Sequence, residues 1–243
     1  MITIILGMHR SGTSTFAGVL HLNKILMGNY KNFWPRPLAQ NPKGFYENYD
    51  FRKINDQLLE EAGYTVKSYN SIVPKLDPSK KILSKMKKII LDTDKENNDW
   101  GWKDPRTCLT INWWIKSLKD TELHDEVKII FVSRNPSSVA KSLKTRNNLP
   151  LSKGLQIWKA YTENAINFCS NSNQNIFYCT FEQLLENPIL TCGKIFDFLD
   201  RKWDPQVVDQ FIDRSISKSG KGPDELVSKE IIDIQNQFND LLS

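Results

Sequence analysis

Apolar residues along this chain form short continuous runs and longer stretches with helical spacing, and the two kinds alternate. The short runs, rich in β-branched residues, predict buried strands at 2–6, 99–103, 127–132 and 175–179. The longer stretches predict helices at about 15–26, 50–62, 111–118, 152–170, 191–199 and 224–242. Asp77-Pro78 is predicted to open a further, basic helix, and another is predicted to begin at Pro136. Strands separated by helices are typical of a three-layer α/β domain, in which helices flank a mostly parallel central sheet.

The size of the chain fits one domain. Its 243 residues are enough to bury a core, and no fixed-period repeat or low-complexity segment interrupts them, so we expect a single domain over residues 1–243. Several prolines predict an irregular segment over 29–44. Ligands of parallel sheets bind at the carboxyl ends of the strands. These ends are predicted at Leu6, Trp102, Val132 and Cys179.

The chain is mildly basic, with 33 Lys and Arg against 28 Asp and Glu and a net charge of +5. The densest basic cluster, Lys80–Lys88, is interleaved with apolar residues at helical spacing, which is typical of a solvated amphipathic helix. No basic stripe interleaved with aromatic residues is present in the sequence, so we expect no nucleic-acid partner.

The cysteines and histidines form no pattern of metal ligands. They are Cys108, Cys169, Cys179, Cys192, His9, His21 and His124. No CxxC pair occurs among them, so we predict no zinc site, and four free thiols fit the reducing cytoplasm. The apolar run at residues 1–7 is far too short to span a membrane and lacks a basic flank. We therefore expect a cytoplasmic protein without a membrane anchor.

A glycine-containing loop, Gly7-Met8-His9-Arg10-Ser11-Gly12-Thr13-Ser14, follows the first predicted strand. Its two glycines have the GxxxxG spacing of a P-loop, in which backbone N–H groups and the start of the next helix bind an anion. Ser11, Thr13 and Ser14 add hydroxyl donors. A tight turn capped by Ser or Thr is the alternative interpretation. The strand before the loop and the helix after it favour phosphate binding.

The loop lacks the lysine of nucleotide triphosphatases. Thr13 follows Gly12 where those enzymes have lysine, and the basic residue is Arg10, inside the loop. No strand ends at an obvious magnesium-binding Asp, because the run 127–132 continues into Ser133-Arg134. A polyphosphate would be poorly neutralised during transfer at such a site. A sulfonate carries much less charge, and arginine, lysine and backbone donors can suffice for it without a metal.

Four elements of the chain resemble, in order, motifs of the sulfotransferase family. The loop 7–14 resembles the 5′-phosphosulfate loop in the Arg-Ser-Gly-Thr form of bacterial and tyrosylprotein sulfotransferases. Residues 131–136 with Ser142 resemble the 3′-phosphate site, in which an arginine and a serine eight residues later bind that phosphate. Residues 102–106 are similar to the family's Lys-Asp-Pro element, and residues 181–188 to its later Tyr-Glu-x-Leu…Pro segment.

This resemblance spans about residues 2–200 and implies an enzyme that uses 3′-phosphoadenosine 5′-phosphosulfate (PAPS) as its donor. Such an enzyme moves the sulfonate to a hydroxyl of a small-molecule or glycan acceptor by in-line displacement without a metal. The implied donor-binding residues are Gly7, Arg10, Ser11, Gly12, Thr13, Ser14, Thr15, Arg134, Ser142 and Phe181. Phe181 stands where the family often has tyrosine, which leaves stacking on adenine. Residues 217–222 are a loose counterpart of the family's late basic Gly-rich loop.

Arg10, Lys103, Glu47 and His9 are the candidate catalytic residues. A guanidinium donates two hydrogen bonds in a fixed fork, so we expect Arg10 to bind the sulfonate and leaving-group oxygens. The resemblance implies that Lys103 contacts the sulfonate, while the residues alone leave a structural pairing with Asp104 equally open. It also implies Glu47 as the base that takes the acceptor's proton, with His9 as its competitor.

Other residues have predicted structural or acceptor-side positions. We expect Arg106 to form a structural salt bridge with Asp104, and Trp113 and Trp114 to pack in the core. The segment of about 29–98 is the predicted acceptor-side insert. The aromatic residues expected to border the acceptor are Trp34, Phe45, Tyr46 and Tyr49.

Two other functions compete with sulfonate transfer. The first is a P-loop small-molecule kinase that uses ATP and magnesium, and the second is a non-catalytic nucleotide-binding module of the same fold. The presence of both Arg10 and Lys103 disfavours the module. A sugar, a lipid head group, a phenol and a peptide side chain are all compatible acceptors, and the sequence carries no signal of oligomeric state or regulation.

Overall fold

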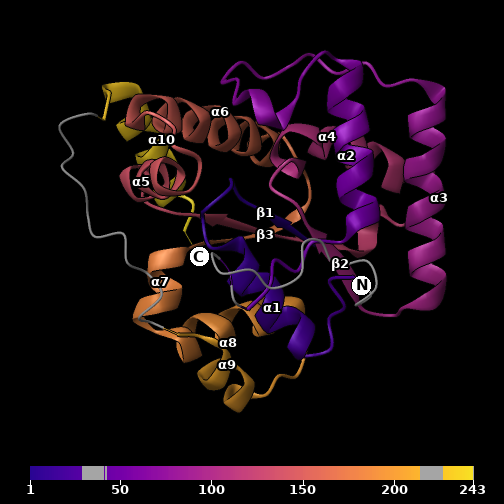
Figure 1. Cartoon of the computed structure of the whole chain (residues 1–243). Helices are drawn as coiled ribbons and strands as arrows, with labels where there is room; N and C mark the ends of the chain where they lie inside the picture. The colour runs from indigo at the N-terminus through magenta and orange to yellow at the C-terminus, as the bar shows by residue number, and fades with distance from the viewer. Residues whose placement is uncertain (29–40, 42, 214–226, 243) are drawn as a thin grey trace.

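The structure, a computed structural model, describes residues 1–28, 41, 43–213 and 227–242. In this part of the chain four strands form one sheet, in the order β2-β1-β3-β4 (Figure 1). They are β1 (Ile2–Leu6), β2 (Trp100–Lys103), β3 (Val127–Ser133) and β4 (Asn175–Thr180). Every pairing between them is parallel. The predicted α/β fold with a parallel sheet is therefore confirmed.

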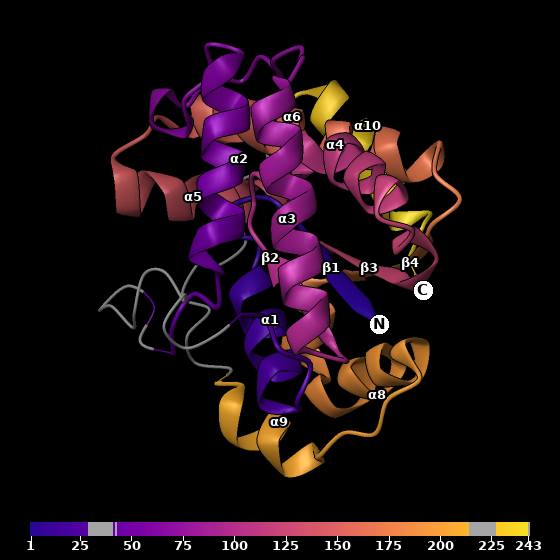
Figure 2. The same ribbon diagram turned by 90° about the vertical axis from the view of Figure 1, so that its right-hand side faces the viewer.

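Helices cover both faces of the sheet, so the molecule has three layers (Figure 1, Figure 2). On one face lie α1 (Thr13–Leu22), α7 (Phe181–Glu186), α8 (Pro188–Leu199) and α9 (Pro205–Phe211). On the other lie α2 (Tyr49–Glu61), α3 (Lys80–Glu96), α4 (Thr107–Asp120), α5 (Pro136–Asn147), α6 (Leu151–Ser170) and α10 (Lys229–Asn239). Short 3-10 helices, η2 (Val66–Ser68) and η3 (His124–Glu126), lie in the connections.

Alternating side chains of the strands fill the two interfaces between sheet and helices. Along β1, Ile4 and Leu6 belong to the core shared with α2, α4 and α6, whereas Ile5 belongs to the core shared with α1 and α8. β3 follows the same rule, with Ile129 on one side and Ile130 on the other. Because β1 and β3 are buried on both faces, their sequences are nearly continuous apolar runs rather than alternating patterns.

An aromatic cluster supports the sheet at β2. Phe51 of α2 stacks on Trp102 with ring centroids 4.7 Å apart, and Trp114 of α4 lies 5.1 Å from each of them. Trp100 completes the cluster. Trp113, the other tryptophan predicted to pack, is half-buried at the rim of this core.

The end of α1 differs from the prediction. α1 stops at Leu22 rather than at 26, because the backbone and side-chain N–H groups of Asn23 both donate to Val19 O. The chain then turns, and Leu26 forms an isolated bridge with Trp100. A helical apolar pattern therefore runs on past the last residue that is helical.

Two other helices begin earlier than predicted. α4 begins at Thr107 rather than at 111. Thr107 and Thr110 are buried and form hydrogen bonds with Asn55. Because these buried residues are polar, the pattern of apolar residues does not show the first turn of the helix. α8 begins at Pro188 rather than at 191, and the short α7 was not predicted as a helix.

Some predicted features lie outside the described residues, among them Trp34, residues 217–222 and nearly all of the irregular segment 29–44. The described part of the predicted insert 29–98 includes α2, η2 and α3, and its helices pack against α4. The single domain over 1–243 stays a prediction.

The four cysteines are buried free thiols. Burial raises the pKa of Cys108, Cys169 and Cys192 to about 12, so these three stay protonated at neutral pH.

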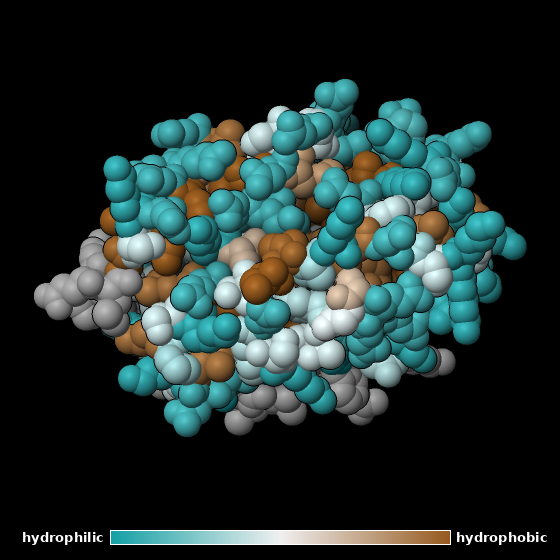
Figure 3. Space-filling model, turned by 90° about the horizontal axis from the view of Figure 1, so that it is seen from above, coloured by the Kyte–Doolittle hydropathy of each residue, from teal (hydrophilic) through white to brown (hydrophobic). Residues whose placement is uncertain are grey.

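The surface seen from the side of α2 and α6 is mostly hydrophilic, with small, separated apolar patches (Figure 3). Within the described ranges, no helix is both long and apolar enough to cross a membrane.

Candidate active site

The carboxyl ends of β1, β2 and β3 continue into Gly7, Asp104 and Arg134. The chain leaves β1 toward β2 on one side, and leaves β3 toward β4 on the other. Connections that diverge in this way open a crevice at the ends of the strands, which is where parallel sheets bind ligands. The predicted site residues lie at this edge.

The loop after β1 is closely packed around its two glycines. Gly12 has a φ of +81°, and a Cβ atom there would lie 2.1 Å from the ring of Phe181. A Cβ atom at Gly7 would lie 2.5 Å from the Thr13 side chain and 2.6 Å from Val132 O. Neither position has room for a side chain.

The same loop leaves polar groups available to an anion. α1 has Gly12 as its N-cap and no side-chain cap, so its first N–H groups lack intrahelical acceptors. The Ser11 hydroxyl is buried and has no hydrogen-bond partner among the described residues. Buried polar groups without partners are rare. A phosphate or sulfonate at this helix start would satisfy them, so the loop residues fit a phosphosulfate.

Arg10 connects this loop to the neighbouring strand and helix. Its Nε donates to Ser142 Oγ of α5 at 2.8 Å, and its carbonyl oxygen accepts from Arg134 Nη1 at 3.0 Å. Burial, and then the charges of Arg146 and Arg134, lower the pKa of Arg10 to about 10. The crowded positive charge would be relieved by a bound anion.

Arg134 extends this cluster toward α7. Its guanidinium carbon lies 5.0 Å from the centroid of the Phe181 ring, and burial lowers its pKa although the charge of Glu182 opposes that shift. Glu182 Oε1 also accepts from the Asn135 N–H at 3.2 Å, which joins the ends of β3 and α7. The structure thus brings Arg134 and Ser142 into contact with Arg10, and the Phe181 ring into contact with Arg134.

A small cavity of about 50 Å³ opens beside the loop. Its lining includes Ser14 and Thr15 from the start of α1, and Phe181 and Phe211 from the opposite wall. Two of the predicted donor-binding hydroxyls, those of Ser14 and Thr15, therefore lie next to the predicted stacking ring.

Lys103 pairs with Glu47 and not with Asp104. Alternation along β2 puts Trp102 on the α4 side and Lys103 on the α1 side. Lys103 Nζ donates to Glu47 Oε1 at 2.8 Å and to Ser14 Oγ at 3.3 Å. The two charged side chains are only 1% and 11% exposed. The pair of Lys103 with Asp104, which the sequence left open, therefore does not form.

Asp104 belongs to a separate network with Arg106, as predicted. Arg106 Nη1 lies 2.8 Å from Asp104 Oδ1, and Asn55 Nδ2 donates to Asp104 Oδ2 at 2.8 Å. Burial alone would raise the pKa of Asp104, but the Arg106 charge and the hydrogen bonds from Asn55 and Arg106 lower it. Arg106 Nε also contacts Asp56 at 2.6 Å. The network joins β2, α2 and α4.

His9 faces the interior. Its ring lies 5.7 Å from that of Tyr161, and its buried Nε2 has no hydrogen-bond partner among the described residues. Burial, then the positive charge of Arg106, lowers the pKa of His9 to about 3, although Asp104 opposes that shift. His9 is neutral at physiological pH and is a weak base.

The aromatic residues predicted to border the acceptor separate in the structure. Phe45 is buried, Tyr46 packs edge-on against Phe211 with ring centroids 5.8 Å apart, and Tyr49 begins α2 with its side chain exposed.

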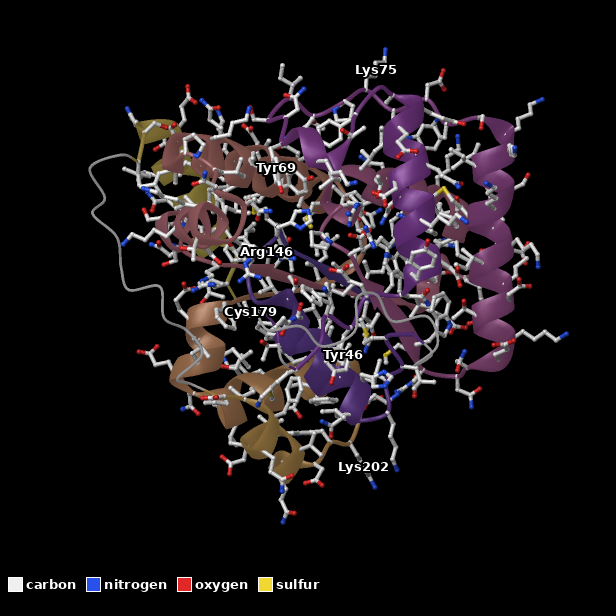
Figure 4. All side chains as sticks on the ribbon, viewed as in Figure 1. Tyr46, Tyr69, Lys75, Arg146, Cys179 and Lys202 are labelled. Carbon is white, nitrogen blue, oxygen red and sulfur yellow. The ribbon has the colours of Figure 1, made fainter. Side chains whose placement is uncertain are left out.

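Arg146 is a residue of this site that the motifs missed. It follows Ser142 by one turn of α5, and its guanidinium carbon lies 5.4 Å from the centroid of the Phe45 ring. In the view of Figure 4 it lies between Tyr69, above it, and Tyr46, below it. The i, i+4 spacing from Ser142 was the signal that would have found it.

Among the described residues, no three His, Cys, Asp or Glu side chains are grouped so that they could hold a metal ion.

The fold and the loop define the class as a parallel α/β protein with a P-loop-like turn after its first strand. A family model described as "Sulfotransferase family" matches residues 3–205. The chain belongs to the sulfotransferase family.

Solved structures of sulfotransferase domains have the same fold. The sulfotransferase domain from the curacin biosynthetic pathway is 18% identical, with a TM-score of 0.55 over 100% of this chain and 98% of that chain. The sulfotransferase domain from the Synechococcus PCC 7002 olefin synthase is 16% identical, with a TM-score of 0.50 over 100% of this chain and 88% of that chain. A search of curated proteins finds no match to this chain.

Proposed function

We propose that this protein transfers a sulfonate group from PAPS to a hydroxyl of a small molecule or glycan, without a metal. The observation that carries the proposal is the convergence of the loop 7–14, Arg134 and Ser142 on Arg10. This convergence supplies cationic and hydroxyl donors for both phosphates of such a nucleotide. Membership of the sulfotransferase family supports the reaction class.

The donor would be held by three elements. The backbone and hydroxyls of the loop 7–14 bind its phosphosulfate, and Arg134 with Ser142 binds its 3′-phosphate. Arg10 exchanges its bond to Ser142 Oγ for the sulfonate and leaving-group oxygens, which frees that hydroxyl. The Phe181 ring, beside the small cavity, offers a stacking surface to the base. The bound donor supplies an activated sulfonate and a phosphate leaving group.

Lys103 and Glu47 divide the remaining tasks. Lys103 Nζ contacts Ser14 of the loop and the Glu47 carboxylate, so it is within reach of both partners of the reaction. When Lys103 turns to the sulfonate, Glu47 Oε1 loses its hydrogen bond and accepts the proton of the acceptor hydroxyl. We prefer Glu47 to His9 as the base, because a pKa of about 3 makes His9 a weak base.

An ATP- and magnesium-dependent kinase is the weaker candidate, since Thr13 stands where a kinase-type P-loop has lysine. We also propose the cytoplasm as the compartment, supported by the four free thiols.

A thermal-shift comparison tests the proposal with adenosine 3′,5′-bisphosphate (PAP), ADP and ATP, each with and without magnesium. A ligand at about one hundred times its Kd stabilises the fold by roughly 2.7 kcal/mol. For a chain of this length the shift is on the order of 5–10 °C. We expect stabilisation by PAP that does not depend on magnesium. Stabilisation by ATP with magnesium, and none by PAP, would contradict the proposal.

A further inference from the structure

Arg146 lies one turn of α5 beyond Ser142, whose hydroxyl accepts the hydrogen bond from Arg10. Arg146 follows Ser142 by four residues, so both project from the same face of α5. After burial, the charge of Arg146 is the largest cause of the lowered pKa of Arg10, and it also lowers the pKa of His9.

The charges of Arg134 and Arg146 both lower the pKa of Arg10, but the two side chains have different surroundings. Arg134 packs on Phe181, beside the proposed donor. Arg146 packs on Phe45, which precedes the proposed base Glu47 by two residues. Arg146 thus lies on the side of the segment that carries Glu47, whereas Arg134 lies on the side of Phe181.

No carboxylate among the described residues pairs with Arg146. The other cations near the base are paired, Lys103 with Glu47 and Arg106 with Asp104, each at 2.8 Å. Within the described ranges Arg146 forms no ion pair, and its side chain is exposed. A guanidinium in this setting can bind a carboxylate or phosphate through a bidentate fork.

The end of α5 is also fixed in position. Asn147 Nδ2 donates to the Tyr69 hydroxyl at 2.6 Å, which joins the last residue of α5 to the segment after η2. Arg146 is therefore presented from a braced helix end over the Phe45 ring, rather than from an unattached loop.

We propose that the acceptor is anionic: a hydroxyl compound that also carries a carboxylate or a phosphate, which Arg146 binds while the hydroxyl lies at Glu47. This inference rests on the proposed sulfonate transfer. Arg146 selects the acceptor and positions its hydroxyl, and it takes no part in binding the donor. A neutral alcohol lacks this contact and leaves the repulsion between Arg146 and Arg10 in place.

Matched acceptors test the inference through transfer from radiolabelled PAPS. Phenol is compared with hydroxybenzoate and hydroxyphenyl phosphate, and glycerol with glycerate and glycerol phosphate. We expect kcat/KM for the anionic members to exceed that for the neutral ones by about tenfold or more. The carboxylate and phosphate arms distinguish the two anions.

Variants of α5 provide the controls. Arg146→Ala should abolish the preference for anions mainly through KM, and Arg146→Glu should favour the neutral members. Lys144→Ala is the matched control, because Lys144 is exposed and lies two residues from Ser142, on another face of the helix. It should keep the wild-type preference.

Calorimetry with PAP separates this inference from the proposed function. We expect Arg146→Ala to change the affinity for PAP by less than about threefold, because an exposed charge beside the donor site acts on it only through solvent-screened electrostatics. Failure of the wild-type protein to bind PAP would overturn the proposed function and this inference with it. If PAP binds but Arg146→Ala weakens its binding about tenfold or more, Arg146 belongs to the donor site and the inference is wrong. It is equally wrong if anionic and neutral members behave alike in every pair, including pairs in which neither reacts.

Discussion

Lys103, the last residue of β2, and Arg106, in the turn that follows, belong to one short motif, yet their ion pairs differ in character. Arg106 is bonded to two carboxylates, Asp104 at 2.8 Å and Asp56 at 2.6 Å. Asn55 supplies a further hydrogen bond to Asp104. With its buried charges matched in this way, the network has no uncompensated charge for a ligand, and removing one partner would leave the other buried and unpaired.

The Lys103–Glu47 pair is the contrasting case. Lys103 has one carboxylate partner and a longer contact to Ser14 in the loop, at 3.3 Å. Glu47 retains an exposed fraction of 11%. Neighbouring residues of one motif therefore have different roles because their side chains point in different directions. The last residue of the strand points to the loop, and the residues of the following turn point to α2.

The largest expected effect concerns the matched network. Asp104→Ala leaves the Arg106 charge without its buried partner, so we expect a loss of about 3–5 kcal/mol in the free energy of unfolding, measured with urea. Asp56→Ala is the control, because Asp56 is 34% exposed and contacts the same guanidinium. Its loss should cost less than about 1 kcal/mol. Equal losses of unfolding free energy in the two variants would show that the buried and the exposed carboxylate contribute alike, and would contradict this account.

The next effect concerns the pair at the loop. Lys103→Met removes the cation that contacts Ser14 and Glu47, and we expect kcat for sulfonate transfer to fall by about two orders of magnitude. Lys87→Met, which breaks a surface pair with Asp120 at 2.7 Å, should leave kcat unchanged. Normal turnover by Lys103→Met would show that the Lys103–Glu47 pair is structural, like the Arg106–Asp104 pair.

The smallest expected effect concerns His9 and the dependence of stability on pH. The pKa of His9 falls from 6.5 to about 3 on folding. Between these values the unfolded chain takes up a proton that the folded chain does not, so stability falls as the pH falls. The contribution is roughly 2 kcal/mol at pH 5. Urea unfolding of His9→Gln should therefore lose less stability from pH 7 to pH 5 than wild type, and parallel losses would contradict the burial of a neutral imidazole.

The sheet, the three layers and the loop could be predicted because their signals are local. Apolar runs such as 127–132 mark buried strands, and Gly7 and Gly12 mark a turn without room for side chains. The Lys103–Glu47 pair could not be predicted from spacing, since 56 residues separate its partners. Without a motif around Glu47, only the fold shows which carboxylate meets the lysine.

Buried polar residues account for other features of the fold that the sequence did not predict. Asn55 accepts from Thr110 Oγ1 and Trp114 Nε1, both at 2.7 Å, and this bonding turns polar positions of α2 and α4 into core. A search for apolar residues does not detect such a polar core. The predicted start of α4 is therefore later than its observed start at Thr107. Arg146 was missed for a different reason: it is exposed and lies outside the four motifs, so only its i, i+4 spacing from Ser142 linked it to the site.

The most direct test is single-turnover transfer of labelled sulfonate from PAPS in the presence of EDTA, with the acceptor pairs named above, by wild type and Glu47→Gln. The glutamine keeps an oxygen for Lys103 but cannot take the acceptor's proton. We predict metal-free transfer by wild type, and a rate lower by about a hundredfold or more in the variant with unchanged affinity for PAP. A near-normal rate for Glu47→Gln, or transfer that requires magnesium, would contradict the account.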